Sequence, residues 1–103
     1  MKKILLVCSA GMSTSLLVTK MQKVAEDKGI ECSIEAVAEA DAMEKLDEVD
    51  VILLGPQVRF LLSKFQKVTK EKNLPVEVID AVAYGTMNGE KVLNKALSLI
   101  NEK

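Results

Sequence analysis

The 103-residue chain contains no histidine and a single arginine, Arg59. Without histidine it cannot carry a phosphohistidine, ligate a metal through imidazole or form a Cys-His dyad of its own. Any imidazole chemistry must therefore come from a partner. A single arginine also excludes the usual multi-arginine clamp for phosphorylated substrates. If the chain binds a phosphate, backbone N–H groups and hydroxyls must hold it.

Long apolar runs and an excess of charge are missing as well. The basic N-terminus leads into an apolar stretch at residues 4–7 that is too short for a signal peptide or a membrane span. A net charge of −1 gives no general attraction to nucleic acid or to anionic membranes. We therefore expect a cytoplasmic protein that binds its partners through a local site.

What is present is a regular alternation of strand-like and helix-like patterns. Hydrophobic residues make up 49% of the chain and charged residues 28%, as in an ordinary globular domain, so we expect residues 1–103 to form one domain. The patterns predict strands at 3–8, 31–37, 51–54 and 76–79, and helices at 13–28, 39–47, 58–72 and 89–101. A loop is expected at 80–87. Four strands that alternate with helices indicate an α/β fold, a parallel sheet with helices on both faces.

Three of the predicted helices have an apolar face at helical spacing. The residues expected to be buried on these faces are Leu17, Met21, Val24 and Ala25 in the first helix, Val58, Leu61, Leu62, Phe65 and Val68 in the third, and Val92, Leu93, Ala96, Leu97 and Ile100 in the last. Gly29 is expected to end the first helix.

The exposure of the strands predicts their order. The first and third strands are continuously apolar, as expected for central strands, whereas the second and fourth carry glutamates, as expected for edge strands. The predicted order is 2-1-3-4. The crossovers then diverge between the first and third strands, and ligands of open parallel sheets bind at such a switch point, at the carboxyl ends of the strands.

Cys8 ends the first strand and precedes a helix start. A thiol at a helix N-terminus lies in the field of unpaired backbone N–H groups and of the helix dipole, both of which favour an anion. We predict that the pKa of the Cys8 thiol lies below its usual value, which would leave a nucleophilic thiolate at neutral pH. Free cysteines are often only small buried hydrophobes, but the switch-point position favours a functional role. Cys32 lies at the far end of an edge strand, so no disulfide is expected.

The segment between Cys8 and the first helix has more hydroxyls than one helix cap requires. We expect Ser13 to cap the helix, Met12 to serve in packing, and the segment as a whole to cradle a phosphate; its residues are Ser9, Ala10, Gly11, Met12, Ser13, Thr14 and Ser15. No Gly-Lys-Ser/Thr follows, so the sequence does not support a Walker-type nucleotide site.

Three residues outside this segment remain open. Arg59 is either a solvated helix residue or a group that attracts a phosphorylated partner. Asp80 is either a turn or cap residue or a polar group near the site. Tyr84 lies in the loop at 80–87, which should leave the same edge of the sheet as Cys8 and form a wall of the crevice together with residues 55–57.

These motifs resemble the IIB component, lactose/cellobiose type, of the phosphoenolpyruvate-dependent sugar phosphotransferase system. The resemblance covers nearly the whole chain. It rests on four ordered motifs, which are ILLVCSAGMSTSLL at 4–17, VILLGPQ at 51–57, PVEVID at 75–80, and Tyr84-Gly85 with Asn88-Gly89.

The resemblance implies both a fold and a role. The fold is a single three-layer domain, similar in topology to flavodoxin and to low-molecular-weight phosphatases. In the family, the cysteine that matches Cys8 takes a phosphoryl group from a phosphohistidine on the IIA component and passes it to a sugar held by the membrane-embedded IIC permease. The resemblance thus implies a phosphotransferase with a phosphocysteine intermediate, a β-linked disaccharide such as cellobiose as acceptor, and no metal or other cofactor. The sugar itself stays open, and we expect a monomer.

Three other functions remain as alternatives. A low-molecular-weight cysteine phosphatase requires C-x5-R, but Thr14 stands at the arginine position, which removes charge-assisted donors worth roughly 1.5 to 3 kcal/mol each. A thiol redox protein would need C-x-x-C, but Gly11 stands at the place of the second cysteine. A pure interaction module would predict that Cys8→Ser leaves cellular function intact.

Overall fold

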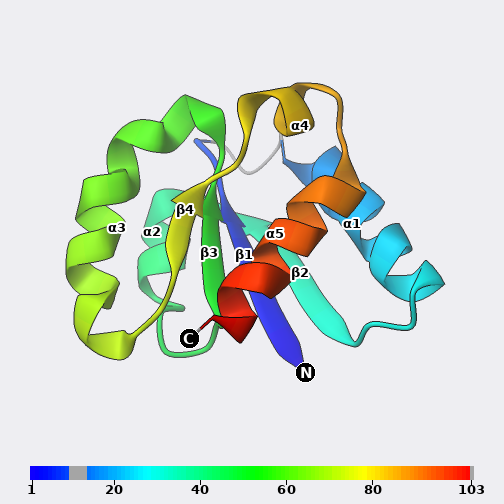
Figure 1. The fold of residues 1–103 in the computed structure, drawn as a ribbon. Coiled ribbons are helices and arrows are strands. Elements are labelled where there is room, and N and C mark those ends of the chain that lie inside the picture. The colour runs from blue at the N-terminus through cyan, green and yellow to red at the C-terminus, as the bar shows by residue number, and fades with distance from the viewer. Residues whose placement is uncertain (10–13, 103) are drawn as a thin grey trace.

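Four parallel strands in the order β2-β1-β3-β4 form the middle layer of the computed structural model, which describes residues 1–9 and 14–102 (Figure 1). The strands are β1 (Lys2–Val7), β2 (Cys32–Val37), β3 (Val51–Leu54) and β4 (Val76–Val78). The α-helices are α1 (Ser15–Asp27), α2 (Glu39–Met43), α3 (Leu62–Thr69), α4 (Ala81–Gly85) and α5 (Gly89–Asn101). Two 3₁₀ helices, η1 (Pro56–Leu61) and η2 (Lys70–Lys72), flank α3.

The predicted fold class and strand order are confirmed. Ile4 pairs with Ile34 of β2 on one side and with Val51 of β3 on the other, both in parallel register. All of β3 and the second half of β1 are buried, whereas β2 and β4 are partly exposed. Apolar side chains on both faces of β1 and β3 therefore place these strands in the centre of the sheet.

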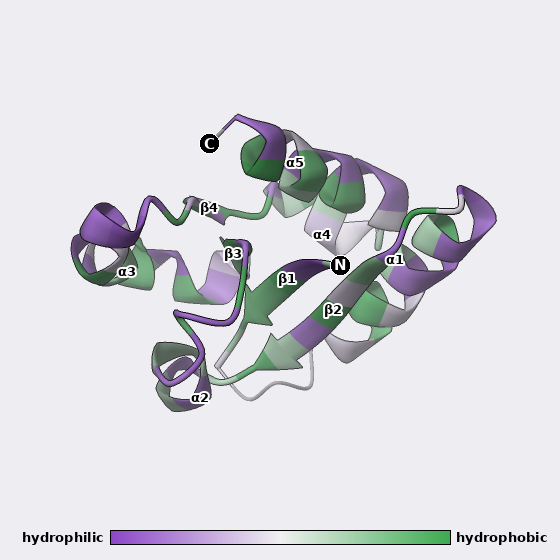
Figure 2. Cartoon of the chain, turned by 90° about the horizontal axis from the view of Figure 1, so that it is seen from below, coloured by the Kyte–Doolittle hydropathy of each residue, from purple (hydrophilic) through white to green (hydrophobic). Residues whose placement is uncertain are grey.

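Helices cover the sheet on both faces. Figure 1 shows α1 and α5 on one face and α2 and α3 on the other, and Figure 2 shows mostly hydrophobic strands between them. Two separate buried clusters correspond to these two faces. Met21 of α1 and Leu93 of α5 belong to the first, and Ala42 of α2 and Phe65 of α3 belong to the second. Burial of these apolar side chains is the main stabilising contribution to such a layered fold.

The segment predicted as one helix at 58–72 is divided into η1, α3 and η2. Val58 has non-helical angles (φ −116°, ψ 25°), and the 3₁₀ turns have three residues per turn, which changes the phase of the apolar face. Val68, expected to be buried, is 42% exposed, whereas Thr69 is 2% exposed. The Thr69 hydroxyl donates to the backbone oxygen of Phe65 (2.9 Å), which explains how a polar side chain is buried there.

Two further expectations need correction on the same face of the sheet. The region 80–87 contains the short helix α4, which Asp80 caps by accepting a hydrogen bond from the backbone N–H of Ala83 (2.9 Å). In α5, Leu99 is buried, whereas Leu97 and Ile100 are only partly buried against the core. Val24 of α1 is likewise only partly buried. Helix α5 itself spans 89–101 as predicted.

The carboxyl ends of the strands and the chain termini lie at opposite ends of the molecule. Their carboxyl ends, together with α4, lie at the top of Figure 1, whereas the two chain termini lie at the bottom. None of the helices in the described residues is both long enough and apolar enough to span a bilayer.

Two glycines have conformational or packing reasons for their positions. Gly29 ends α1 with a left-handed φ of 68°, as the sequence predicted. Gly89 begins α5 where this helix meets α1. A Cβ atom at residue 89 would lie 2.7 Å from the backbone carbon of Lys20 and 2.8 Å from the backbone nitrogen of Met21. The absence of a side chain therefore permits the close contact between α1 and α5.

Gly89→Ala is expected to destabilise the protein by about 1–3 kcal/mol, because the added methyl group overlaps with the backbone of α1. The change in the free energy of unfolding is measured by urea denaturation. Gly85→Ala is the matched control, since a Cβ atom there meets nothing within 4 Å, and it should be neutral or slightly stabilising. Equal stability of Gly89→Ala and the wild type would contradict the proposed packing.

Candidate functional site

Cys8 lies immediately beyond the carboxyl end of β1, between its two neighbouring strands. Its backbone N–H donates to the carbonyl of Val37 (3.1 Å), and the N–H of Gly55 donates to the carbonyl of Val7 (2.8 Å). These bonds continue the pairing of β1 with β2 and β3 up to Cys8. The cysteine is therefore fixed at the predicted switch point, where crossovers to either side diverge.

The sulfur of Cys8 is in contact with a buried hydroxyl. Thr14 Oγ1 donates to Cys8 Sγ at 3.2 Å, and both residues are 0% exposed. Thr14 is the N-cap residue of α1, yet its side chain makes no capping hydrogen bond to the helix. A hydrogen bond donated to sulfur favours the thiolate, whereas exclusion of water disfavours it. The first turn of α1 therefore begins next to the candidate nucleophile, as the sequence predicted.

The remaining residues of the predicted phosphate cradle are only partly described. Ser9 is exposed directly after Cys8, and Ser15 is the exposed first residue of α1. The expectations for Ala10, Gly11, Met12 and Ser13, including the capping role of Ser13, fall outside the described residues. Among the described residues, the structure thus brings Thr14 to the sulfur and leaves the phosphate contacts of the others as predictions.

The turn after β3 forms one wall of the site. A Cβ atom on Gly55 would lie 3.8 Å from Cys8 Cβ and 2.8 Å from Gln57 Oε1. Gln57 Nε2 in turn donates to the Tyr84 hydroxyl at 2.8 Å. Helix η1 after β3 and helix α4 after β4 are therefore linked, as expected for two walls of one crevice. The sequence predicts that residues 55–57 form a wall of the crevice but gives no role to the Gln57 side chain, although its position directly after Gly55-Pro56 marks it as a turn residue at this edge.

Asp80 and Arg59, the two charged candidates, have different surroundings in the structure. Asp80 is the cap of α4, and its carboxylate also lies 3.7 Å from the ammonium group of Lys91. The hydrogen bond from the Ala83 backbone holds the pKa of Asp80 below its usual value, and Lys91 lowers it further. Asp80 is thus an anchored cap, one of the two roles that the sequence left open. Arg59 is exposed in η1, with no ion pair among the described residues.

Large apolar side chains are exposed around this edge. Leu16 lies in the first turn of α1, Phe60 in η1 and Val82 in α4, and Phe60 is 75% exposed. The three elements follow β1, β3 and β4 in the chain, so they begin at the edge where these strands end. We call Leu16, Phe60 and Val82 the apolar rim. Exposed apolar groups that share an edge with a candidate site are typical of a surface that contacts another protein.

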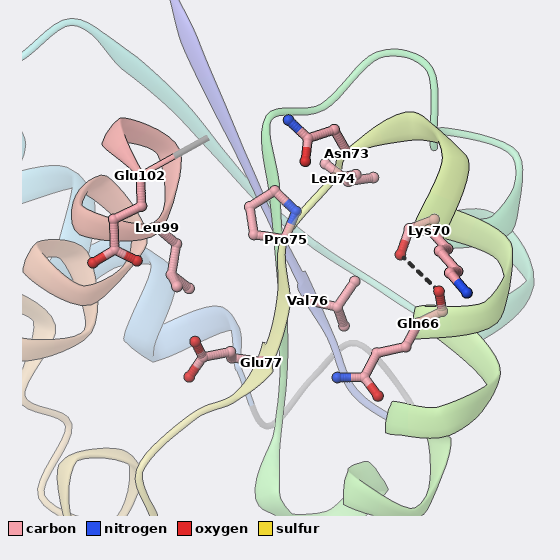
Figure 3. Close-up of a pocket in the computed structure, with 10 residues that line it drawn as sticks. Gln66, Lys70, Asn73, Leu74, Pro75, Val76, Glu77, Leu99 and Glu102 are labelled. Carbon is pink, nitrogen blue, oxygen red and sulfur yellow. Dashed lines mark hydrogen bonds between the residues drawn. The ribbon is translucent and has the colours of Figure 1, made fainter.

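A groove of about 540 Å³ lies at the other end of the sheet. Figure 3 shows Leu74, Pro75 and Val76 along its floor, with Lys70 from η2 on one side and Glu102 after α5 on the other. Its position at the start of β4 separates it from Cys8. Its lining charges are of both signs and are exposed to solvent. The groove therefore takes no part in chemistry at the cysteine.

Cys32 lies at the end of the sheet opposite Cys8. It pairs with Lys2 at the start of β2, it is only partly buried, and no disulfide joins it to Cys8. Burial raises the pKa of the Cys32 thiol above its usual value, and the positive charge of Lys2 offsets part of this rise. No group of three or more potential metal ligands occurs in the part of the chain that the structure describes.

A buried thiol at the switch point of a parallel α/β sheet, hydrogen-bonded to a hydroxyl at the start of the next helix, defines an α/β protein with a single-cysteine site. The chain belongs to the family of PTS system, Lactose/Cellobiose specific IIB subunits, whose model matches residues 3–95. Proteins of this family are components of a sugar phosphotransferase system and are phosphotransferases in general; they work with IIA and IIC partners.

Individual relatives support the family assignment. The chain is 52% identical to the PTS system oligo-beta-mannoside-specific EIIB component of Bacillus subtilis (strain 168), with 97% of each chain covered. It is 46% identical to the PTS system cellobiose-specific EIIB component of Lactococcus lactis subsp. lactis (strain IL1403), also with 97% of each covered. The solution structure of the cellobiose-specific phosphotransferase IIB component protein from Borrelia burgdorferi superposes with a TM-score of 0.85 at 50% identity, covering 99% of this chain and 94% of that one.

The raised pKa of Cys32 leads to a prediction for its alkylation. In Cys8→Ser, which leaves Cys32 as the only thiol, the rate of reaction with iodoacetamide should be low near neutral pH and should increase with pH. Half of the maximal rate should be reached at a higher pH in the folded protein than in urea, because unfolding removes the burial that disfavours the thiolate. Superimposable pH profiles for folded and unfolded protein would contradict this account.

Proposed function

We propose that the chain is a phosphoryl carrier in which Cys8 takes a phosphoryl group from a phosphohistidine of the IIA component and transfers it to a sugar bound by the IIC permease. The observation that carries this proposal is the buried contact between Cys8 Sγ and the Thr14 hydroxyl at the switch point of the sheet, in a chain that belongs to a phosphotransferase family. A hydroxyl donor at the start of a helix suits a sulfur that alternates between thiolate and phosphothiol.

The proposed reaction consists of two balanced transfers. In the first, the sulfur of the Cys8 thiolate attacks phosphorus, the S–P bond forms, the N–P bond breaks, and the partner's imidazole keeps the electron pair. In the second, a sugar hydroxyl attacks the same phosphorus, the S–P bond breaks, the thiolate is regenerated, and the hydroxyl proton is released. Each transfer passes in line through a loose transition state, so positioning and neutral hydrogen-bond donors supply most of the catalysis.

Neutral donors around the sulfur also favour transfer over hydrolysis. Thr14 occupies the position where a low-molecular-weight phosphatase has arginine, and the structure shows its hydroxyl on the cysteine sulfur. The carboxylate of Asp80 is held by the backbone of α4 and by Lys91, which leaves it poorly placed to activate water. The phosphothiol is therefore expected to survive until the second partner arrives. No observation favours the phosphatase alternative.

Transfer requires access to a sulfur that is fully buried in this structure. We propose that the surroundings of Cys8 open locally when a partner docks, since reacting atoms must approach to about 3–3.5 Å. The apolar rim supplies the docking surface, because Leu16, Phe60 and Val82 lie on the elements that follow β1, β3 and β4 at the edge where Cys8 lies. We further propose that residues 1–103 act as one monomeric IIB domain in the cytoplasm and that residues 9–15 hold the phosphate.

The sugar is proposed at the level of a class. Relatives at 52% and 46% identity carry the names of oligo-β-mannoside and cellobiose systems. Both names describe β-linked sugars, and we propose a β-linked disaccharide similar to cellobiose as the acceptor. The carrier touches little of the sugar beyond the phosphoryl group, so a transport assay with the cognate IIC permease and a set of β-disaccharides identifies the sugar directly.

Cys8→Ser should abolish phosphorylation of the chain, because serine supplies no thiolate at the switch point. The purified protein is incubated with phosphorylated IIA, and the adduct is located by mass spectrometry of the intact protein and of its peptides. Cys32→Ser is the matched control and should take up one phosphoryl group at the wild-type rate. An adduct on any residue other than Cys8, or an undiminished adduct in Cys8→Ser, would refute the proposal.

Phe60→Ser should raise the KM for phosphorylated IIA by roughly ten- to a hundredfold, the loss expected when one large apolar side chain is no longer buried in an interface. The value of kcat should change little, because Phe60 takes no part in the chemistry. Val68→Ser is the control, as Val68 is also exposed but lies on α3, outside the apolar rim. An equal KM for the two variants would show that the rim does not contact IIA.

A further inference from the structure

The hydrogen bond between Gln57 and Tyr84 connects η1, which follows β3, with α4, which follows β4. We infer that the Tyr84 hydroxyl and the Gln57 carboxamide form a polar wall that binds an oxygen of the phosphoryl group on Cys8. This inference rests on the proposed function and assigns it two binding residues outside the segment at 9–15. The residues stand 27 positions apart in the sequence and meet only because β3 and β4 are adjacent.

Gln57 lies against the part of the backbone that touches Cys8. Its Oε1 atom is 2.8 Å from the point where a Cβ atom on Gly55 would be, and this same point is 3.8 Å from Cys8 Cβ. The carboxamide and the Cys8 side chain thus both lie close to a common position. Because Gly55 has no side chain, nothing from residue 55 stands between them. A phosphoryl group on the sulfur would extend beyond Cβ by the sulfur and phosphorus atoms, which is the reach that the inferred contact requires.

The hydrogen-bond inventory of Tyr84 leaves one donor for a ligand. A tyrosine hydroxyl has one proton to donate and lone pairs to accept with, and the Tyr84 oxygen already accepts from Gln57 Nε2 at 2.8 Å. In the described parts of the chain, its own proton has no acceptor. Accepting a bond from the carboxamide also strengthens the hydroxyl as a donor. An oxygen of an anionic phosphoryl group is the acceptor that such a donor suits best.

The hydroxyl is held in place by the structure below it. The aromatic ring of Tyr84 packs on the core between the sheet, α1 and α5. Its backbone N–H donates to the carbonyl of Asp80 (2.9 Å), inside the helix that Asp80 caps. The contact between Gln57 and Tyr84 remains open to solvent. The wall is thus held by the core beneath it and is accessible to solvent. A group that first receives and then releases a phosphate needs both properties.

Both groups of the wall are neutral, which suits a carrier. A guanidinium at this place would bind the phosphoryl group through charge-assisted bonds, which are about twice as strong as bonds between neutral groups. A carrier that holds its cargo too strongly transfers it slowly, because stabilisation of the phosphothiol raises the barrier to the next step. Two neutral donors orient the phosphoryl group while keeping this stabilisation small.

Substitution of Tyr84 and of Gln57 tests the inference, with phosphorylated IIA as donor. Tyr84→Phe keeps the packed ring and removes one hydrogen bond to a charged group, so kcat for phosphorylation of Cys8 should fall by about tenfold at unchanged KM. Gln57→Glu should lower kcat at least as much, because its carboxylate accepts the Tyr84 proton and repels the phosphoryl group. In both variants the ³¹P resonance of the phosphocysteine should shift from its wild-type position.

The matched control is Gln66→Glu, which adds the same charge at an exposed position on α3 by the distant groove. It should show the wild-type kcat and ³¹P resonance. Urea denaturation should give the same midpoint for all variants. A raised KM with an unchanged ³¹P resonance would overturn the inference, because the pair would then contact the partner instead of the phosphate. Variants equal to the wild type in every readout would overturn it too. A wild type that takes no phosphate on Cys8 would instead refute the proposed function, and this inference with it.

Discussion

Backbone pairing of β1 with both of its neighbours determines where the sulfur lies. The N–H of Cys8 donates to the carbonyl of Val37, and the N–H of Gly55 donates to the carbonyl of Val7. Backbone hydrogen bonds on both sides of β1 therefore fix the end of this strand at Cys8. Burial of β3 and of residues 4–7 of β1 stabilises this arrangement, because both faces of these strands pack against apolar side chains. Every proposed role of Cys8 depends on this placement, since α1 and the turns after β3 and β4 are positioned relative to it.

A neutral hydroxyl, and not a guanidinium group, contacts the cysteine sulfur at this site. Arginine would bind a phosphate by a charged fork, whereas the Thr14 hydroxyl is a single neutral donor directed at sulfur. The difference matters for the proposed function, in which the phosphoryl group passes to a second molecule and is not released to water. Under the proposed function, a chain without histidine would take part in phosphohistidine chemistry because the imidazole would belong to the partner, and this chain would supply the buried sulfur as the acceptor.

Sequence patterns were sufficient wherever one local signal dominated. The uninterrupted apolar run of β3 and the amphipathic period of α5 predicted both elements with their observed bounds. The apolar composition of the two central strands predicted the strand order of the sheet. The patterns were insufficient where two signals competed. Val68 and Thr69 are adjacent candidates for one buried position, and the 3₁₀ turn before α3 decides between them. Helix α4 is too short to show a period, and the contact of Gln57 with Tyr84 depends on the adjacency of β3 and β4.

Both chain ends lie at the pole of the molecule opposite the cysteine (Figure 1). A tether attached at either end would therefore leave the reactive edge uncovered and would not have to cross it. Such attachment would make encounters with a donor or an acceptor intramolecular. The effective concentration would depend on linker length and would lie in the millimolar range for short flexible linkers. The fold is thus compatible with multidomain arrangements in which a flexible linker lets this domain move between a donor and an acceptor.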